Sequence, residues 1–386
     1  TSNTVFGYLS GASLASGGNE NCLFGHHAGN ELKLAVRNIA IGYNAMFDSY
    51  IDDTQDALTF DNVFIGHGSG GGTWTGAASK GNVGVGTSTM DAGMNTAYYN
   101  TAVGNSALSG LTSGDDNVAI GGDAGKQLTS GDDNTFVGYS AGTATSSGSS
   151  NVAVGHSALA TQANASAVGN VAVGTSALKD MNGAHTNNIA IGLAAIENAS
   201  TATTFTNNIA IGAYAFDDSG SNDQTGTIAI GGNALTALTS GARNIALGYQ
   251  SLMSGTGFAD NTAVGFEAGK YLGDDGASNH SSFNTIFGRS AMGGGHTSTP
   301  AGNTAHLNTA IGHGVLGGGT GSTTNLTATN NTAIGYASMN VATSATSNVT
   351  IGHGSGQSIT TATRNVAVGY GTLDALTANA DTANGN

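Results

Sequence analysis

One short phrase returns twenty times along the chain and limits what it can fold into. The phrase is Asn (Thr at residue 227), then mostly Val, Thr or Ile, then any residue, then Val, Ile or Phe (Leu at residue 247), then Gly; residues 151–155 read Asn-Val-Ala-Val-Gly. Successive copies never start fewer than 17 residues apart, and longer intervals add residues only between the phrases. A fixed minimum with tolerated additions is typical of a solenoid, in which each repeat forms one coil.

Alternating apolar residues within the phrase predict a short β-strand. Val152 and Val154 flank Ala153, a period of two that favours a strand with β-branched residues on one face. The third residue after the repeat Gly is nearly always Ala, Ser or Thr, which indicates a second short strand. Recurrent Gly and the missing 3.6-residue period argue against helices. We therefore predict an all-β parallel β-roll of about twenty coils, with two strands per coil and Val/Ile packed between two sheets.

Composition narrows the class of protein. The net charge is -15, from 24 acidic and 9 basic residues, which argues against nucleic acid as a partner because phosphate binding needs clustered Lys and Arg. The sequence contains no stretch of 18 apolar residues of the kind that would span a membrane as a helix. We expect residues 1–386 to form a single elongated repeat domain with coils over residues 3–373. We also expect the chain to be a fragment or processed part of a longer fibre protein. Adjoining domains at both ends would then cover the open edges of the stacked strands.

Two columns of the repeat are predicted to support the stack. The Asn at the start of each phrase suits a turn, where its side chain can join an amide ladder with the Asn of the next coil. The Gly suits a close approach of backbones. These ladder residues include Asn100, Asn117, Asn134, Asn151, Gly104, Gly121, Gly138 and Gly155.

The alanine column, three places after each repeat Gly, is predicted to lie at a subunit interface. Its residues are too small to fill a wide core, yet too uniform for an unconstrained surface. Small side chains in register let neighbouring backbones approach closely, so we predict a homotrimer. The interface candidates are Ala107, Ala124, Ala141, Ala158 and Ala177.

Histidines and aspartates raise the question of bound metal. Five histidines directly follow a repeat Gly, in an aromatic column that Tyr and Phe share. We predict ring stacking along this column, with rings of three His near a three-fold axis as the alternative. Paired aspartates such as Asp115 and Asp116 are predicted to be solvated loop charges. No cofactor is expected, with calcium as the alternative for these pairs.

Catalysis is not expected. The only Gly-x-Ser-x-Gly string, residues 138–142, falls on repeat positions and lacks the following helix that a nucleophile elbow requires.

Binding is instead predicted in the loops that exceed the minimum period, because exposed aromatic residues on a rigid scaffold suit glycan or protein recognition. The receptor-contact candidates are Tyr50, Trp74, Tyr271, His296 and His306.

The tandem pattern Asn-x-Ala-Ile/Val-Gly-x-x-Ala resembles the heads of trimeric autotransporter adhesins. The longer copy at residues 100–117 is closer to repeats in phage and large-virus tail-fibre proteins. The resemblance implies a left-handed trimeric β-roll at a virion tail fibre or a bacterial outer surface, attached to host glycan or protein receptors. The alternatives are an end-to-end filament, a glycan-cleaving tailspike and an ice-binding solenoid.

Overall fold

The computed structural model describes residues 2–49, 59–74, 79–161, 167–181, 183, 185–199, 205–218, 224–273, 281–293, 303–317 and 325–374. The chain divides into two compact units, residues 1–187 and 188–386, which are considered separately. Within the described ranges there is no helix, and so none that could span a membrane. The predicted all-β parallel solenoid is confirmed.

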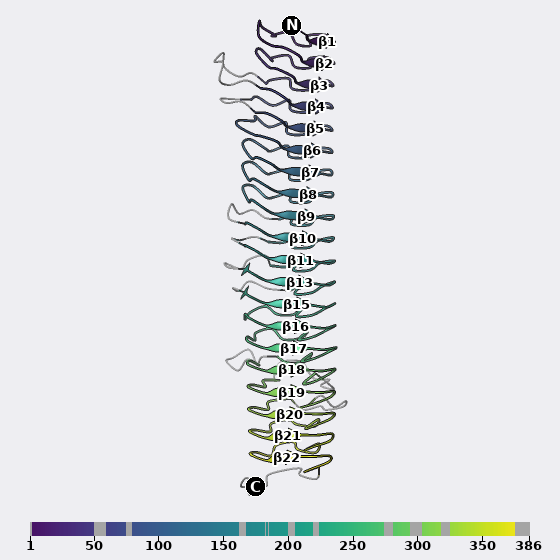
Figure 1. The fold of residues 1–386 in the computed structure, drawn as a ribbon, viewed down its shortest axis with the longest axis vertical. Coiled ribbons are helices and arrows are strands. Elements are labelled where there is room, and N and C mark those ends of the chain that lie inside the picture. Colours follow the sequence, from purple (N-terminus) through teal and green to yellow (C-terminus); the bar gives the residue numbers. More distant parts are fainter. Residues whose placement is uncertain are drawn as a thin grey trace. The chain divides into compact units, whose positions relative to one another are not determined.

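The described part of unit 1 contains ten three-residue strands, one for each copy of the phrase. Each strand pairs in parallel with the strand of the next coil, so that Val118 lies opposite Thr135 and Thr135 opposite Val152. Figure 1 shows these strands stacked one above another. They are β1 (Thr4–Phe6), β2 (Cys22–Phe24), β3 (Ile39–Ile41), β4 (Val63–Ile65), β5 (Val83–Val85), β6 (Thr101–Val103), β7 (Val118–Ile120), β8 (Thr135–Val137), β9 (Val152–Val154) and β10 (Val171–Val173).

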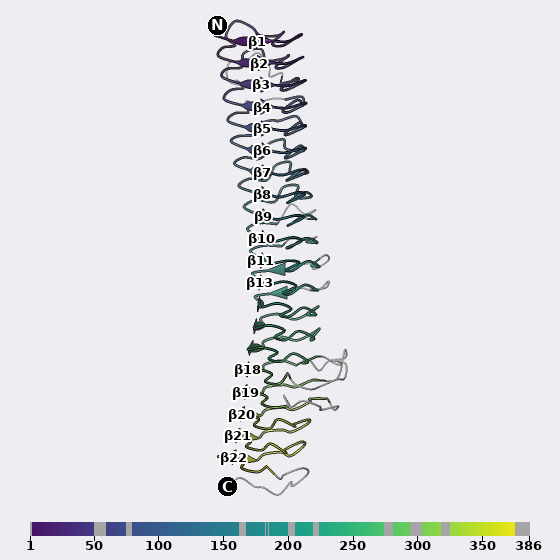
Figure 2. The same ribbon diagram turned by 90° about the vertical axis from the view of Figure 1, so that its right-hand side faces the viewer.

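Unit 2 repeats this arrangement with ten further three-residue strands, again in parallel register between successive coils (Figure 2). Two shorter strands, β12 (Phe205–Thr206) and β14 (Gln224–Thr225), pair with each other outside the main ladder. The main strands are β11 (Ile189–Ile191), β13 (Ile209–Ile211), β15 (Ile228–Ile230), β16 (Ile245–Leu247), β17 (Thr262–Val264), β18 (Thr285–Phe287), β19 (Thr309–Ile311), β20 (Thr332–Ile334), β21 (Val349–Ile351) and β22 (Val366–Val368).

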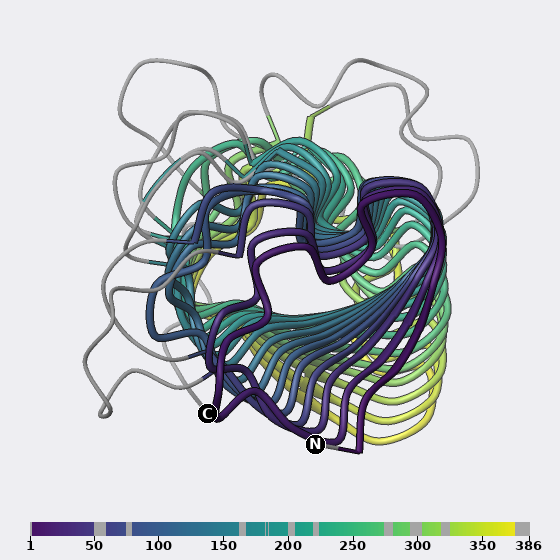
Figure 3. The same ribbon diagram turned by 90° about the horizontal axis from the view of Figure 1, so that it is seen from above.

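The predicted second strand is wrong for most coils. In the described parts of the chain, the alanine column lies in a tight turn, where residues on either side adopt left-handed φ values. Around Ala158, for example, φ is 54° at Ser157 and 53° at Leu159. A strand requires extended φ throughout, so this segment cannot form one. Figure 3 shows the coils of unit 1 viewed along the stack.

The prediction that Val and Ile point inward is also wrong. In β9 the middle residue, Ala153, is fully buried, whereas Val152 is half-buried and Val154 is exposed. Successive side chains of a strand point to opposite faces, so a three-residue strand turns either one or two side chains inward. Here the chain returns over the face of the middle residue. The core is therefore built from that residue, the alanine column and the large apolar residue after it, such as Leu159.

Side-chain volumes inside the core compensate for one another. Where the middle strand residue is large, the place after the alanine column is often Gly. A Cβ at Gly70 would lie 2.8 Å from the ring of Phe64, and one at Gly142 would lie 2.6 Å from the ring of Phe136. Interiors packed at crystal-like density leave no room for both groups. This complementarity explains why that place alternates between Gly and large apolar residues in the sequence.

Candidate functional site

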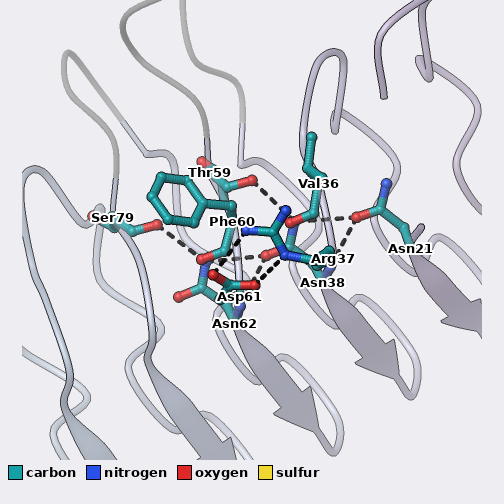
Figure 4. Close-up of polar contacts among 9 residues, drawn as sticks. All are labelled: Asn21, Val36, Arg37, Asn38, Thr59, Phe60, Asp61, Asn62 and Ser79. Carbon is teal, nitrogen blue, oxygen red and sulfur yellow. Dashed lines mark hydrogen bonds and ion pairs between the residues drawn. The ribbon is translucent and has the colours of Figure 1, made fainter. Parts of the chain in front are cut away.

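The asparagine ladder holds successive coils at a fixed spacing. The backbone N–H and the Nδ2 of Asn134 both donate to Oδ1 of Asn117, at 3.0 and 2.9 Å, and Nδ2 also donates to the carbonyl of Gly148 at 2.8 Å. Figure 4 shows the same pattern from Asn62 to Asn38 and on to Asn21. Buried amide groups need such partners. The ladder predicted for Asn100, Asn117, Asn134 and Asn151 is confirmed.

The glycine column marks the closest approach between coils. Gly104, Gly121, Gly138 and Gly155 have φ between +132° and +140°, a region that L side chains rarely adopt. A Cβ at Gly121 would lie 2.6 Å from the carbonyl carbon of Gly138 and nearer still to its oxygen. The predicted close approach of backbones at these four glycines is confirmed.

The outer face of the strands carries two columns in register, one of apolar residues and one in which Thr is interspersed among apolar residues. We name the second and fourth places of the phrase, taken along each unit, the outer stripe. Ile120 in unit 1 leaves 43% of its surface exposed, and Phe287 in unit 2 leaves 56% exposed. Because the register is the same at every rung, these side chains form continuous rows. In β7 to β9 the rows consist of Val118, Thr135 and Val152, and of Ile120, Val137 and Val154.

The aromatic column forms the predicted ring stack. In unit 1 the ring centroids of Tyr8 and His26 are 5.2 Å apart, and His26 to Tyr43 and Tyr43 to His67 are both 5.1 Å. In unit 2 the series His313, Tyr336, His353 and Tyr370 has spacings of 5.2, 4.9 and 5.0 Å. These spacings match the strand separation in a sheet, so stacking follows from the coil register.

The five trimer-interface candidates do not lie on the surface. All five are 0% exposed within the single chain, namely Ala107, Ala124, Ala141, Ala158 and Ala177. The polar members of this column show which way its side chains point. Ser338 belongs to the column, and its Oγ lies 2.7 Å from Oγ1 of Thr350, the middle residue of β21. The alanines thus face the inside of their own coil. Their small size fits a thin core, which is why uniformity alone misled the prediction.

The receptor-contact candidates have different outcomes. Trp74 is 1% exposed, its Nε1 donates to the carbonyl of Gly70 at 3.1 Å, and its ring meets Phe64 edge-on, so the prediction of an exposed contact is wrong for it. Tyr271 and His306 are half-buried and remain candidates. Tyr50 and His296 lie outside the described residues.

The aspartate pair at Asp115 and Asp116 belongs to a ladder that the sequence did not predict. Oδ1 of Asp115 accepts the backbone N–H of Tyr98 at 2.8 Å, and Oδ1 of Asp132 accepts that of Asp115 at 2.9 Å. Burial raises the pKa of Asp115, the bond from Tyr98 opposes that change, and the nearby carboxylate of Asp132 adds to it. Asp115 is therefore a structural acceptor in addition to being a charge.

Two other groups titrate abnormally. Burial, helped by the charges of Glu197 and Asp218, raises the pKa of Asp217 to about 6. Burial lowers the pKa of His185 to about 4.

Across the described coils, no three His, Cys, Asp or Glu side chains converge to hold a metal ion.

Ion pairs also link adjacent coils on the surface. The guanidinium of Arg37 donates to both carboxylate oxygens of Asp61, at 2.7 and 3.0 Å, and this hydrogen bonding lowers the pKa of Asp61 (Figure 4). Arg243 and Asp260 repeat the geometry in unit 2, at 2.6 and 2.8 Å. Each of these residues immediately precedes a phrase Asn, so the coil register brings the partners together.

Comparison of the chain with known protein families, with curated proteins and with solved structures gave no match.

Proposed function

We propose that the chain is a non-catalytic, homotrimeric segment of an extracellular fibre or adhesin that attaches to glycan or protein receptors on a host surface. The observation that carries the proposal is the outer stripe. Coils locked by the asparagine and glycine columns give a rigid scaffold, and loops on such a scaffold are suited to recognition.

The outer stripe supports association with further copies of the chain. Contiguous exposed apolar surface on a soluble protein typically marks an interaction site. A second copy has the same rung spacing and the same apolar rows, so its stripe would match along the whole length of each unit. Homo-oligomers commonly use such closed, repeated contacts. The number three comes from the resemblance to trimeric adhesin heads and tail fibres.

Solution mass tests the assembly. The wild-type chain should have a native mass of three times 37.8 kDa. Ile120→Glu places a charge in the outer stripe and should shift the mass toward the monomer while the coil fold persists. Ser130→Glu, an exposed loop position, is the matched control and should remain trimeric. A wild-type monomer would contradict the trimer.

Cell binding tests the attachment function. Fluorescently labelled trimer should bind candidate host cells, and prior treatment of the cells with glycosidases or proteases would distinguish glycan from protein receptors. Unchanged binding after both treatments, or no binding to any cell type in a broad panel, would contradict receptor attachment.

A column of threonines supports ice binding as a second candidate. In β17 to β20 the second-place row of the outer stripe consists of threonines in register, namely Thr262, Thr285, Thr309 and Thr332. Regularly spaced hydroxyl and methyl groups are what ordered surface water would match. Thermal hysteresis in a freezing assay, lost in Thr309→Lys, would favour this function.

A further inference from the structure

Four side chains in unit 1 form an aromatic–lysine patch, namely Phe60, Lys80, Tyr98 and Tyr99. Phe60, Lys80 and Tyr98 each stand two places before a phrase Asn, and parallel bridges join them in that order. The Lys80 ammonium lies 5.5 Å from the centroid of the Phe60 ring, 5.2 Å from that of Tyr98 and 5.8 Å from that of Tyr99. Tyr99 is 56% exposed and the other three are half-buried, so the patch is open to solvent.

Among the residues that the structure describes, no carboxylate neutralises the charge of Lys80. The chain has 24 acidic and only 9 basic residues, and other bases pair with acids, as in Arg37–Asp61, Lys126–Asp123 and Lys270–Glu267. Lys80 makes no ion pair with any residue that the structure describes. Contact with aromatic rings holds an ammonium in place but leaves its net charge available to a ligand.

The charged groups on either side of the patch determine where an anionic ligand would lie. At one end, Arg37 lies over the Phe60 ring at 5.8 Å and is engaged with Asp61. At the other end, the carboxylate of Asp115 accepts the backbone N–H of Tyr98. An anionic group is therefore attracted to Lys80 and repelled from the Asp115 end, while the ring of Tyr99 offers an uncharged surface beside it.

We propose that this patch binds a carboxylate-bearing saccharide. The apolar face of a pyranose ring would lie on Tyr99, and its carboxylate would accept hydrogen bonds from Lys80 Nζ. A charge-assisted bond to an ammonium discriminates an acidic sugar from a neutral one of the same shape. The inference rests on the proposed attachment function and names the class of receptor for it.

Titration calorimetry with the full chain tests the proposal. The probes are tetragalacturonate, its methyl ester and sialyllactose. The ester keeps the sugar faces but has no charge, and the two acids separate uronic from sialic acid as the source of the carboxylate. We expect an acidic probe to bind and the ester to bind about tenfold more weakly, the effect of one hydrogen bond to a charged group.

Variants locate the site. Lys80→Met keeps the alkyl stem and should weaken binding of the acid about tenfold without changing that of the ester. Tyr99→Ala should weaken binding of both, and Tyr99→Phe, which keeps the ring, should restore it. Lys126→Met removes a lysine that is paired with Asp123 and should have no effect.

The possible results distinguish failure of the saccharide site from failure of the proposed attachment function. Equal binding of acid and ester, or wild-type affinity in Lys80→Met, would overturn the patch assignment. If cell binding persists in Lys80→Met, attachment stands and this site does not mediate it. If neither cells nor saccharides bind, both proposals fail.

Discussion

Adding a methyl group at Gly121 tests whether close backbone approach sets the rung spacing. Gly121 has φ of +140°, and its added Cβ would lie 2.6 Å from the carbonyl carbon of Gly138 in the next coil. Contacts of that length do not occur, and the obstructing atoms are backbone that cannot rotate away. The coils must separate, which would break the bond from the N–H of Gly138 to the carbonyl of Ile120, now 2.8 Å.

The cost can be worked from these two effects. Holding an L residue at this φ costs about 1–3 kcal/mol, and losing one or two cross-coil hydrogen bonds adds about 1 kcal/mol each. We expect Gly121→Ala to lower the free energy of unfolding by about 3 kcal/mol. The neighbouring Gly122→Ala is the control, because its Cβ would meet only the movable ring of Tyr139 at 3.2 Å and should change stability by less than about 0.5 kcal/mol.

Two measurements are needed because a solenoid can open one coil at a time. Denaturant unfolding reports the whole chain, and amide hydrogen exchange reports the affected coils. Protection should fall at Gly138 and its neighbours in Gly121→Ala and stay unchanged in Gly122→Ala. Equal unfolding midpoints and equal protection in the two variants would refute the idea that these glycines set the spacing.

Three further predictions follow from buried polar and aromatic groups. Thr227→Asn should raise the free energy of unfolding by about 1 kcal/mol in a denaturant titration, because Thr227 Oγ1 is buried without a hydrogen-bond partner and an Asn there could accept from Asn244. Asp217 has a pKa raised from 3.8 to about 6, so it binds its proton more tightly in the folded state; the stability that this gives is fully present below about pH 4 and is lost as pH rises through 6. Asp217→Asn should remove that loss, about 1 kcal/mol after allowance for its partial exposure, in melts at pH 4 and pH 7.5, whereas Asp218→Asn, which removes one of the two charges that help to raise the pKa of Asp217, should reduce the loss only in part. Trp74, the single tryptophan, should show blue-shifted emission that iodide does not quench; quenching would contradict its buried position.

Much of the fold could be predicted from the repeat itself. The three central residues of every phrase form a strand, as at Val152–Val154, because the spacing of the phrases fixes the register of the coils. The asparagine and glycine columns were also predictable, since each residue type has a backbone or amide requirement that few alternatives satisfy. Ring stacking followed in the same way from the shared position of Tyr and His.

The direction of the side chains could not be predicted in this way. A period of two separates Ala153 from Val152 and Val154 but does not say which face the returning chain covers. That path depends on left-handed φ values at ordinary residues such as Ser157 and Leu159, which no local preference favours. The burial of Trp74 likewise depends on contact with Phe64, which lies in a different part of the coil.

The reversed facing of the strands strengthens the case for a partner. If Val and Ile filled the core, as the sequence suggested, the outer face would carry small residues and need no cover. With Ala153 inside, the larger side chains at Val152 and Val154 contribute only part of their apolar surface to the coil. The remaining apolar surface is stabilising only if something else buries it. The inner columns support the coil and the outer stripe remains exposed, so if the proposed association uses the stripe, substitutions in the two sets should have separable effects: on unfolding for the inner columns and on native mass for the outer stripe.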